Sequence, residues 1–323
     1  MTGWLLRRIA QAIATFGVAA VLMFVLMRLA PGDPLARMQE DRPMSGEEVA
    51  RLRTIYGLDQ PIHRQFAAFA QGVLRADLGV SIEHGRPVTT LLASRIGPTL
   101  LLGGAAILLN FTLGLWLGVR QAVRHGSRED RALTVLSLAG YATPSFWLGL
   151  VLAWLVGIEL GWLPVAGMRD PLLPRDATWL AHAVDIGRHL VLPALTLSIV
   201  TIAGTMRYQR SALLEVLRLP YIGTAKAKGV PDRTVVWRHA WRNALFPVIT
   251  LFGLWLPLLV TGSVFVEMVF AWPGLGSLAA NAASGRDYPL VMGAAMLAAG
   301  MVVTASLMTD LAYALLDPRV RYT

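Results

Sequence analysis

Six strongly apolar runs of 17 to 27 residues divide this chain of 323 residues, and none of them contains Asp, Glu, Lys, Arg or His. Each run is about as long as a helix that crosses roughly 30 Å of hydrocarbon. Because lipid offers the backbone no hydrogen-bond partners, each run is expected to be helical. The sequence therefore predicts an all-α polytopic membrane protein with six transmembrane helices in a single domain over 1–323. The expected spans are 9–27, 96–119, 132–158, 190–206, 244–266 and 289–309.

The composition excludes several classes of protein. Only 15% of the residues are charged, against about 25% in ordinary soluble domains, which argues against a water-soluble fold. The chain has no Cys, and its six His residues are scattered without ligand spacing, so neither thiolate chemistry nor a metal site is expected. It also lacks the G-x-x-x-x-G-K-[ST] phosphate loop and any nucleophile elbow. We therefore expect a non-catalytic chain without cofactors.

Basic residues are divided unequally between the segments that separate the runs. If both termini lie on one side, that side carries 16 Lys or Arg and 6 Asp or Glu, and the opposite side carries 13 and 14. Because cytoplasmic segments of membrane proteins carry an excess of Lys and Arg, both termini are expected in the cytoplasm. The formal net charge of +9 then reflects this sidedness, not an affinity for nucleic acid.

The first external segment, 28–95, is long enough to fold as a cap on the outer face. Ser45 followed by Glu48 fits a helix capping box, and Gly57 is suited to end that helix. A second helix is expected to begin at Pro61. The apolar side chains that it is expected to pack on the bundle are Phe66, Phe69 and Val73.

The longest internal segment, 207–243, carries eight basic side chains. It is expected to contain two helical pieces, 221–228 and 232–242, separated by a turn. Gly229 favours a left-handed helix end, and Pro231 favours the first turn of the next helix. The result is an elbow that projects into the cytoplasm and offers an apolar edge to a partner protein or to lipid headgroups. The side chains expected on that edge are Tyr221, Ile222, Ala225 and Val230.

Several segments of the chain resemble the membrane-spanning subunits of binding-protein-dependent ABC importers, in the dipeptide, oligopeptide and nickel permease branch. The clearest are Tyr221-Ile-Gly-Thr-Ala-Lys-Ala-Lys-Gly229 and Arg238-His-Ala-Trp-Arg-Asn-Ala-Leu-Phe-Pro247, which resemble the cytoplasmic coupling loop of that family. The others are Arg28-Leu-Ala-Pro-Gly-Asp-Pro34, Arg95-Ile-Gly-Pro-Thr99, Phe270-Ala-Trp-Pro-Gly-Leu-Gly276, Arg286-Asp-Tyr-Pro289 and Asp317-Pro-Arg319. Each alone is only a turn or helix-end signal, but their order and spacing together are specific.

The resemblance implies a subunit of the bacterial plasma (inner) membrane that imports di- or oligopeptides. Its implied partners are a second, similar permease, two ATPase subunits that hydrolyse ATP, and an extracytoplasmic substrate-binding protein. The implied ATPase-coupling residues are Tyr221, Thr224, Ala225, Lys226, Ala227, Lys228 and Gly229, with Arg238, His239, Arg242 and Asn243 supporting the elbow. Gly223 departs from the family pattern, which usually has a charged or long polar residue there.

Two alternatives stay open at the level of the sequence. Similar permeases carry nickel chelates, glutathione or some sugars, so the cargo is not fixed by the resemblance. An ion-coupled secondary transporter is the alternative from a different class. Such carriers typically keep ionisable groups inside the membrane, where each costs about 2.5–3.5 kcal/mol on insertion scales. The six runs contain none, which favours the ATP-driven importer.

Overall fold

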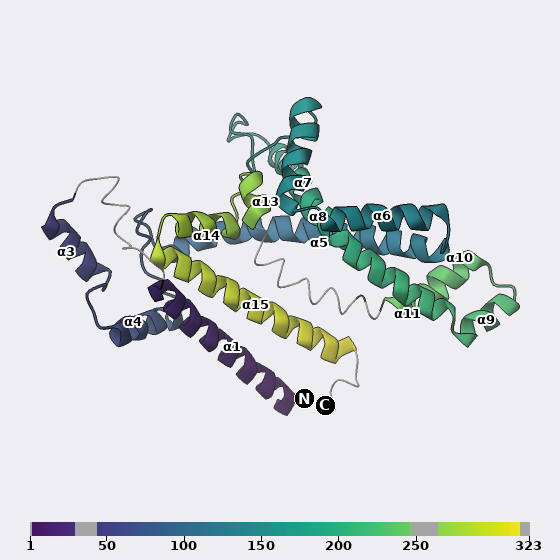
Figure 1. Cartoon of the computed structure of the whole chain (residues 1–323), viewed down its shortest axis with the longest axis horizontal. Coiled ribbons are helices and arrows are strands. Elements are labelled where there is room, and N and C mark those ends of the chain that lie inside the picture. The colour runs from purple at the N-terminus through teal and green to yellow at the C-terminus, as the bar shows by residue number, and fades with distance from the viewer. Residues whose placement is uncertain (1, 30–43, 246–247, 249–263, 317–323) are drawn as a thin grey trace. The chain divides into compact units, whose positions relative to one another are not determined.

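The computed structural model of the chain describes residues 2–29, 44–245, 248 and 264–316 (Figure 1). Throughout these residues the regular structure is helical, apart from one isolated bridge between Val80 and Pro87. The chain forms two compact units. The first unit comprises Met1–Thr99 and Gly274–Thr323, and the second comprises Leu100–Pro273. The expected all-α class is confirmed.

Four helices are long and apolar enough to cross a membrane. They contain the first, second, fourth and sixth of the predicted spans. The helices are α1 (Thr2–Leu29), α5 (Val88–Val123), α8 (Trp179–Leu217) and α15 (Tyr288–Leu316).

The third predicted span is a pair of helices with a sharp bend. α6 (Arg128–Ala142) is followed by α7 (Ser145–Leu152), which continues as a π-helix (Ala153–Glu159), and the two parts are bent by 104°. Pro144 explains the break, because its ring excludes a helical backbone at Thr143. Thr143 is accordingly extended, with ψ of 127°.

The fifth predicted span and two of the family-like segments fall on residues that are largely not described. Most of the fifth span, 244–266, falls there, as do most of the segment 28–34 and all of 317–319. Counting the bent pair as one, the described part of the chain has up to five spans.

In the first unit, α1 and α15 lie side by side (Figure 1). Arg8 of α1 pairs with Asp310 of α15 at 3.3 Å. Toward the other end of α1, the ring of Phe24 contacts Phe66 and Phe69 of α4 (Ile62–Leu74), with ring centroids 5.2 and 5.8 Å apart. The predicted packing of the second helix of segment 28–95 is confirmed for Phe66 and Phe69, because both rings contact Phe24 of α1.

The first helix of segment 28–95, α3 (Gly46–Ile55), has the predicted ends. Ser45 accepts a hydrogen bond from the Glu48 backbone N–H (3.2 Å), and the Glu48 carboxylate accepts one from the Ser45 backbone N–H (3.0 Å). After the helix, Gly57 has φ of +62°. The capping box and the glycine stop are therefore both present.

In the second unit, α5 and α8 approach closely. Cβ atoms built on Gly114 and Gly118 would lie 3.0 Å from Thr205 and 2.7 Å from the Met206 carbonyl oxygen. The small residues of α5 thus allow close contact between two membrane-crossing helices. α8 has 39 residues, a length of about 58 Å, which is well beyond the roughly 30 Å of the hydrocarbon. Its last turns lead directly into the segment after Leu217.

Candidate coupling site

The candidate site is the helical elbow that follows α8. Its first half is α9 (Pro220–Ala227), which begins with Pro220 in the first turn, where no backbone N–H is needed. Gly229, just after the C-cap residue Lys228, has φ of +74° and stops the helix. Two backbone bonds close this end, from Gly229 to the Lys226 carbonyl (2.9 Å) and from Val230 to the Ala225 carbonyl (3.2 Å). The predicted turn is therefore present.

The second half of the elbow starts directly after this turn. α10 (Asp232–Thr234) continues as a π-helix (Val235–Ala240) and then as α11 (Trp241–Ala244). The two predicted helical pieces are confirmed, but the sequence did not predict the π-helical turn. A salt bridge of 3.5 Å joins Lys226 to Asp232 across the turn, and its exposed side chains make it a weak contact.

One side of the elbow is buried in the second unit. Ile222 is 1% exposed and belongs to an apolar cluster that includes Leu213 of α8 and Val235 of the π-helix. Burial of such a side chain stabilises by about 1.5–3 kcal/mol. The prediction of an exposed apolar edge is wrong for Ile222, because the second half of the elbow folds back over it. Ala225 and Val230 are partly buried against the same cluster.

Hydrogen bonds also join the two halves. The Asn243 side-chain amide donates to the Tyr221 phenolic oxygen (2.7 Å) and to the His239 carbonyl (3.4 Å). The Tyr221 hydroxyl donates to the same carbonyl (3.4 Å). Three of the sequence-predicted residues are thus brought together. Arg238 and Arg242 are exposed, and within the described residues no hydrogen bond or ion pair connects them to α9.

The outward side of the elbow is polar and basic. Gly223 lies on it, and a Cβ built there meets nothing within 4 Å, so a long polar side chain would fit. The other exposed residues of this side, together with the 40% exposed Tyr221, are Thr224, Lys226, Ala227, Lys228 and Gly229. The exposed side of the elbow thus offers hydrogen-bonding groups and positive charge. Its opposite side is held in place by apolar contacts.

A buried ion pair that the sequence reasoning missed lies in the same unit. Arg210 of α8 donates two hydrogen bonds to Asp130 of α6, of 3.0 and 2.9 Å. Asp130 stands ahead of the apolar run that starts at 132, and its side chain is 5% exposed. The hydrogen bonds from Arg210, with one from the Gly126 backbone N–H, outweigh burial and lower the pKa of Asp130 to about 2. No local signal links residues 80 positions apart.

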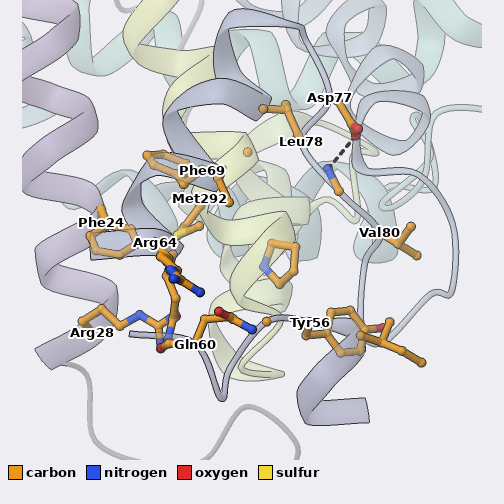
Figure 2. Close-up of a pocket in the computed structure, with 18 residues that line it drawn as sticks. Phe24, Arg28, Tyr56, Gln60, Arg64, Phe69, Asp77, Leu78, Val80 and Met292 are labelled. Atoms are coloured by element: carbon orange, nitrogen blue, oxygen red, sulfur yellow. Dashed lines mark hydrogen bonds between the residues drawn. The ribbon is translucent and has the colours of Figure 1, made fainter. Parts of the chain in front are cut away.

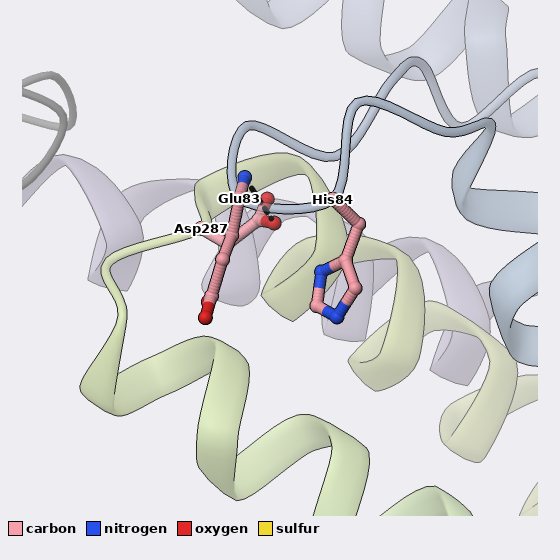
Figure 3. Close-up of side chains that lie close together, drawn as sticks. All are labelled: Glu83, His84 and Asp287. Atoms are coloured by element: carbon pink, nitrogen blue, oxygen red, sulfur yellow. Dashed lines mark hydrogen bonds between the residues drawn. The ribbon is translucent and has the colours of Figure 1, made fainter.

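One group in the described residues has metal-ligand chemistry. Potential ligand atoms of Glu83, His84 and Asp287 lie within 4.8 Å of one another (Figure 3). Asp287 already accepts hydrogen bonds from the Ser81 hydroxyl (2.5 Å) and from the backbone N–H groups of Glu83 (3.2 Å) and Leu290 (3.2 Å). These hydrogen bonds satisfy the buried Asp287 carboxylate and link the turn at Ser81 to the start of α15.

Long apolar helices and an elbow that packs against the end of one of them define an all-α polytopic membrane protein. Residues 86–322 match the family described as binding-protein-dependent transport system inner membrane component, and residues 1–102 match the corresponding N-terminal family. The chain belongs to this family. The elbow, 220–244, lies within the longer match.

The similarity to individual relatives covers whole chains. The protein is 40% identical over 325 residues to a putative peptide permease of Brucella ovis, covering all of both chains. It is 38% identical over 323 residues to the oligopeptide transport system permease protein AppB of Bacillus subtilis, again covering all of both. It is 36% identical over 337 residues to the dipeptide transport system permease protein DppB of Escherichia coli K12, covering 100% of this chain and 99% of that one.

Proposed function

We propose that this chain is the permease subunit of an ATP-driven importer of di- or oligopeptides, forming half of the translocation pathway. The observation that carries the proposal is the construction of the elbow. Ile222 and Val235 are buried behind it, while Thr224, Lys226 and Lys228 are exposed on its outward side. A short helix that is fixed from behind and polar in front transmits the movement of a docked protein to α8.

The work of ATP hydrolysis belongs, in this proposal, to a separate pair of ATPase subunits. The coupling residues are those of the outward side and the turn, with Tyr221, His239 and Asn243 holding the two halves together. Arg238 and Arg242 are placed to contact the ATPase or the lipid headgroups, since they are exposed and basic. The positive-inside distribution supports cytoplasmic termini, which place the elbow on the ATPase side.

The peptide cargo is supported by the names of the relatives, which are peptide, oligopeptide and dipeptide permeases. Delivery would come from an extracytoplasmic binding protein, and a second permease would complete the pathway. Uptake of a labelled dipeptide by the reconstituted assembly tests this proposal. A nickel chelate or glutathione that is taken up while peptides are not would overturn the peptide assignment.

Substitutions on the outward side test the coupling site. Ala227→Glu alters an exposed residue at the end of α9, so the fold is expected to survive. We expect it to reduce both co-purification of the ATPase and peptide-stimulated ATP hydrolysis. Ala67→Glu, at an exposed position of α4, is the matched control. Equal ATPase association and transport in both variants would refute the role of the elbow.

A further inference from the structure

The first unit contains a pocket of about 470 Å³ near the last turn of α1 (Figure 2). This volume lies within the roughly 300–1,000 Å³ of typical ligand pockets. The walls come from α1, α4, α15, the end of α3 with the segment that joins it to α4, and the segment after α4. They are largely apolar, with Phe24, Phe69, Leu78 and Met292 among the lining side chains. The pocket is therefore suited to a molecule with an apolar part.

Two arginines give this pocket its charge. Arg28 of α1 and Arg64 of α4 both line it, and no carboxylate among the described residues forms an ion pair with either. Asp77 also lines the pocket, but Figure 2 shows it well apart from the two arginines. Its carboxylate accepts a hydrogen bond from the Gly79 N–H (3.1 Å). The pocket as a whole thus carries one excess positive charge.

A polar acceptor in the same wall has no partner in the described part of the chain. The Gln65 side-chain nitrogen donates to the Gln60 carbonyl (2.6 Å), which fixes the amide. The Gln65 amide oxygen is buried and accepts no hydrogen bond. A buried acceptor of this kind is costly unless a ligand or water donates to it. This oxygen is fully covered by the protein, so a ligand hydroxyl can donate to it only when the Gln65 side chain turns toward the pocket.

We propose that this pocket binds the headgroup of an anionic phospholipid of the phosphatidylglycerol type. Guanidinium groups recognise phosphate oxygens with paired, charge-assisted hydrogen bonds, and a glycerol headgroup supplies hydroxyl donors for the Gln65 oxygen. The position of Arg28 on a membrane-crossing helix favours a lipid over a free anion. Arg28 is in the last turn of α1, a membrane-crossing helix whose neighbouring Val25 and Leu26 are 43% and 61% exposed, so acyl chains can lie along the helix below the headgroup.

Titration of the purified full-length chain in detergent tests the proposal. Short-chain phosphatidylglycerol, phosphatidylethanolamine, phosphatidylcholine, inorganic phosphate and a dipeptide are added separately, and apparent affinity is read from the shift in melting temperature. We expect phosphatidylglycerol to bind most tightly. Arg28→Gln and Arg64→Gln should each weaken it about fivefold. Arg75→Gln, an exposed arginine outside the pocket, is the matched control and should bind as the unchanged chain does.

Each other outcome contradicts the proposal. Equal affinity for phosphatidylcholine or phosphatidylethanolamine would remove the selectivity for an anionic lipid. Saturation by inorganic phosphate or by the dipeptide at the same affinity would assign the pocket to a free anion or to a solute. Unchanged phosphatidylglycerol affinity in the Arg28→Gln and Arg64→Gln variants would place the lipid elsewhere. Arg64→Lys, which keeps the charge, should retain part of the affinity and shows that the variant chain folds.

Discussion

The side-chain amide of Asn243 lies 2.7 Å from the phenolic oxygen of Tyr221 and ties the last helix of the elbow to its first. The two residues are 22 positions apart, with the whole turn between them. Because Tyr221 also donates to the His239 carbonyl, its hydroxyl is fixed from both sides. This contact, together with buried Ile222, joins the two halves of the elbow into one packed unit.

Removing the Tyr221 hydroxyl tests whether these hydrogen bonds hold the two halves of the elbow together. Tyr221→Phe keeps the ring and removes both the acceptor of the Asn243 amide and the donor to the His239 carbonyl. Because a typical hydrogen bond contributes about 0.5–1.5 kcal/mol net, we expect a loss of stability of at least about that size. We also expect faster hydrogen exchange of 220–244, measured by mass spectrometry. Tyr208→Phe, at an exposed tyrosine of α8, is the control. Identical exchange in both variants would show that the contact does not order the elbow.

Truncating the buried anchor should have a larger effect. Ile222→Ala removes a side chain that is 1% exposed, and such core truncations cost about 2–5 kcal/mol. Ile222→Val should cost about 0.5–1.5 kcal/mol. Melting temperatures measured in detergent rank the variants by stability. The control is Ile62→Ala, because Ile62 is 61% exposed; a similar loss in that variant would show that Ile222 is no special anchor.

The elbow shows which features the sequence could predict. The turn at Gly229 depends on neighbouring residues alone, and so does the capping box of Ser45; both were predicted because local chemistry decides them. The burial of Ile222 depends on α8 and on the second half of the elbow, so an apolar residue on a short basic loop looked exposed. The pairing of Asp130 with Arg210 joins two helices 80 positions apart, and no spacing rule reaches that far.

That ion pair gives a prediction about pH. The pKa of Asp130 is lowered from 3.8 to about 2 in the folded chain, chiefly by the hydrogen bonds from Arg210. The carboxylate therefore contributes stability that is fully present above pH 3.8 and is lost as the pH falls toward 2. Asp130→Asn should melt lower than the unchanged chain at pH 5–8, and the difference should narrow at lower pH.

Melting temperatures over a pH series measure this difference. Asp232→Asn is the matched control, because the Asp232 side chain is 85% exposed and its bridge to Lys226 is weak. It should melt close to the unchanged chain at every pH. A difference for Asp130→Asn that stays constant down to about pH 2, the folded pKa of that carboxyl, would mean that the ion pair does not stabilise the fold.

The contact between α5 and α8 gives a pair of glycine substitutions with different outcomes. A Cβ on Gly118 would lie 2.7 Å from the Met206 carbonyl oxygen and 2.8 Å from the Gln209 Cβ, so Gly118→Ala must push the two helices apart. Overpacking of this kind costs about 1–3 kcal/mol. A Cβ on Gly104, in the same helix, meets nothing within 4 Å.

Gly104→Ala should therefore be neutral or stabilising, since alanine is the better helix former. Melting temperature and detergent resistance, measured on both variants side by side, separate packing from propensity. Because α8 carries the elbow, Gly118→Ala should also lower peptide-stimulated ATP hydrolysis while Gly104→Ala leaves it unchanged. Equal behaviour of the two variants would mean that the close approach of α5 and α8 is not needed for stability or for transmitting movement from the elbow.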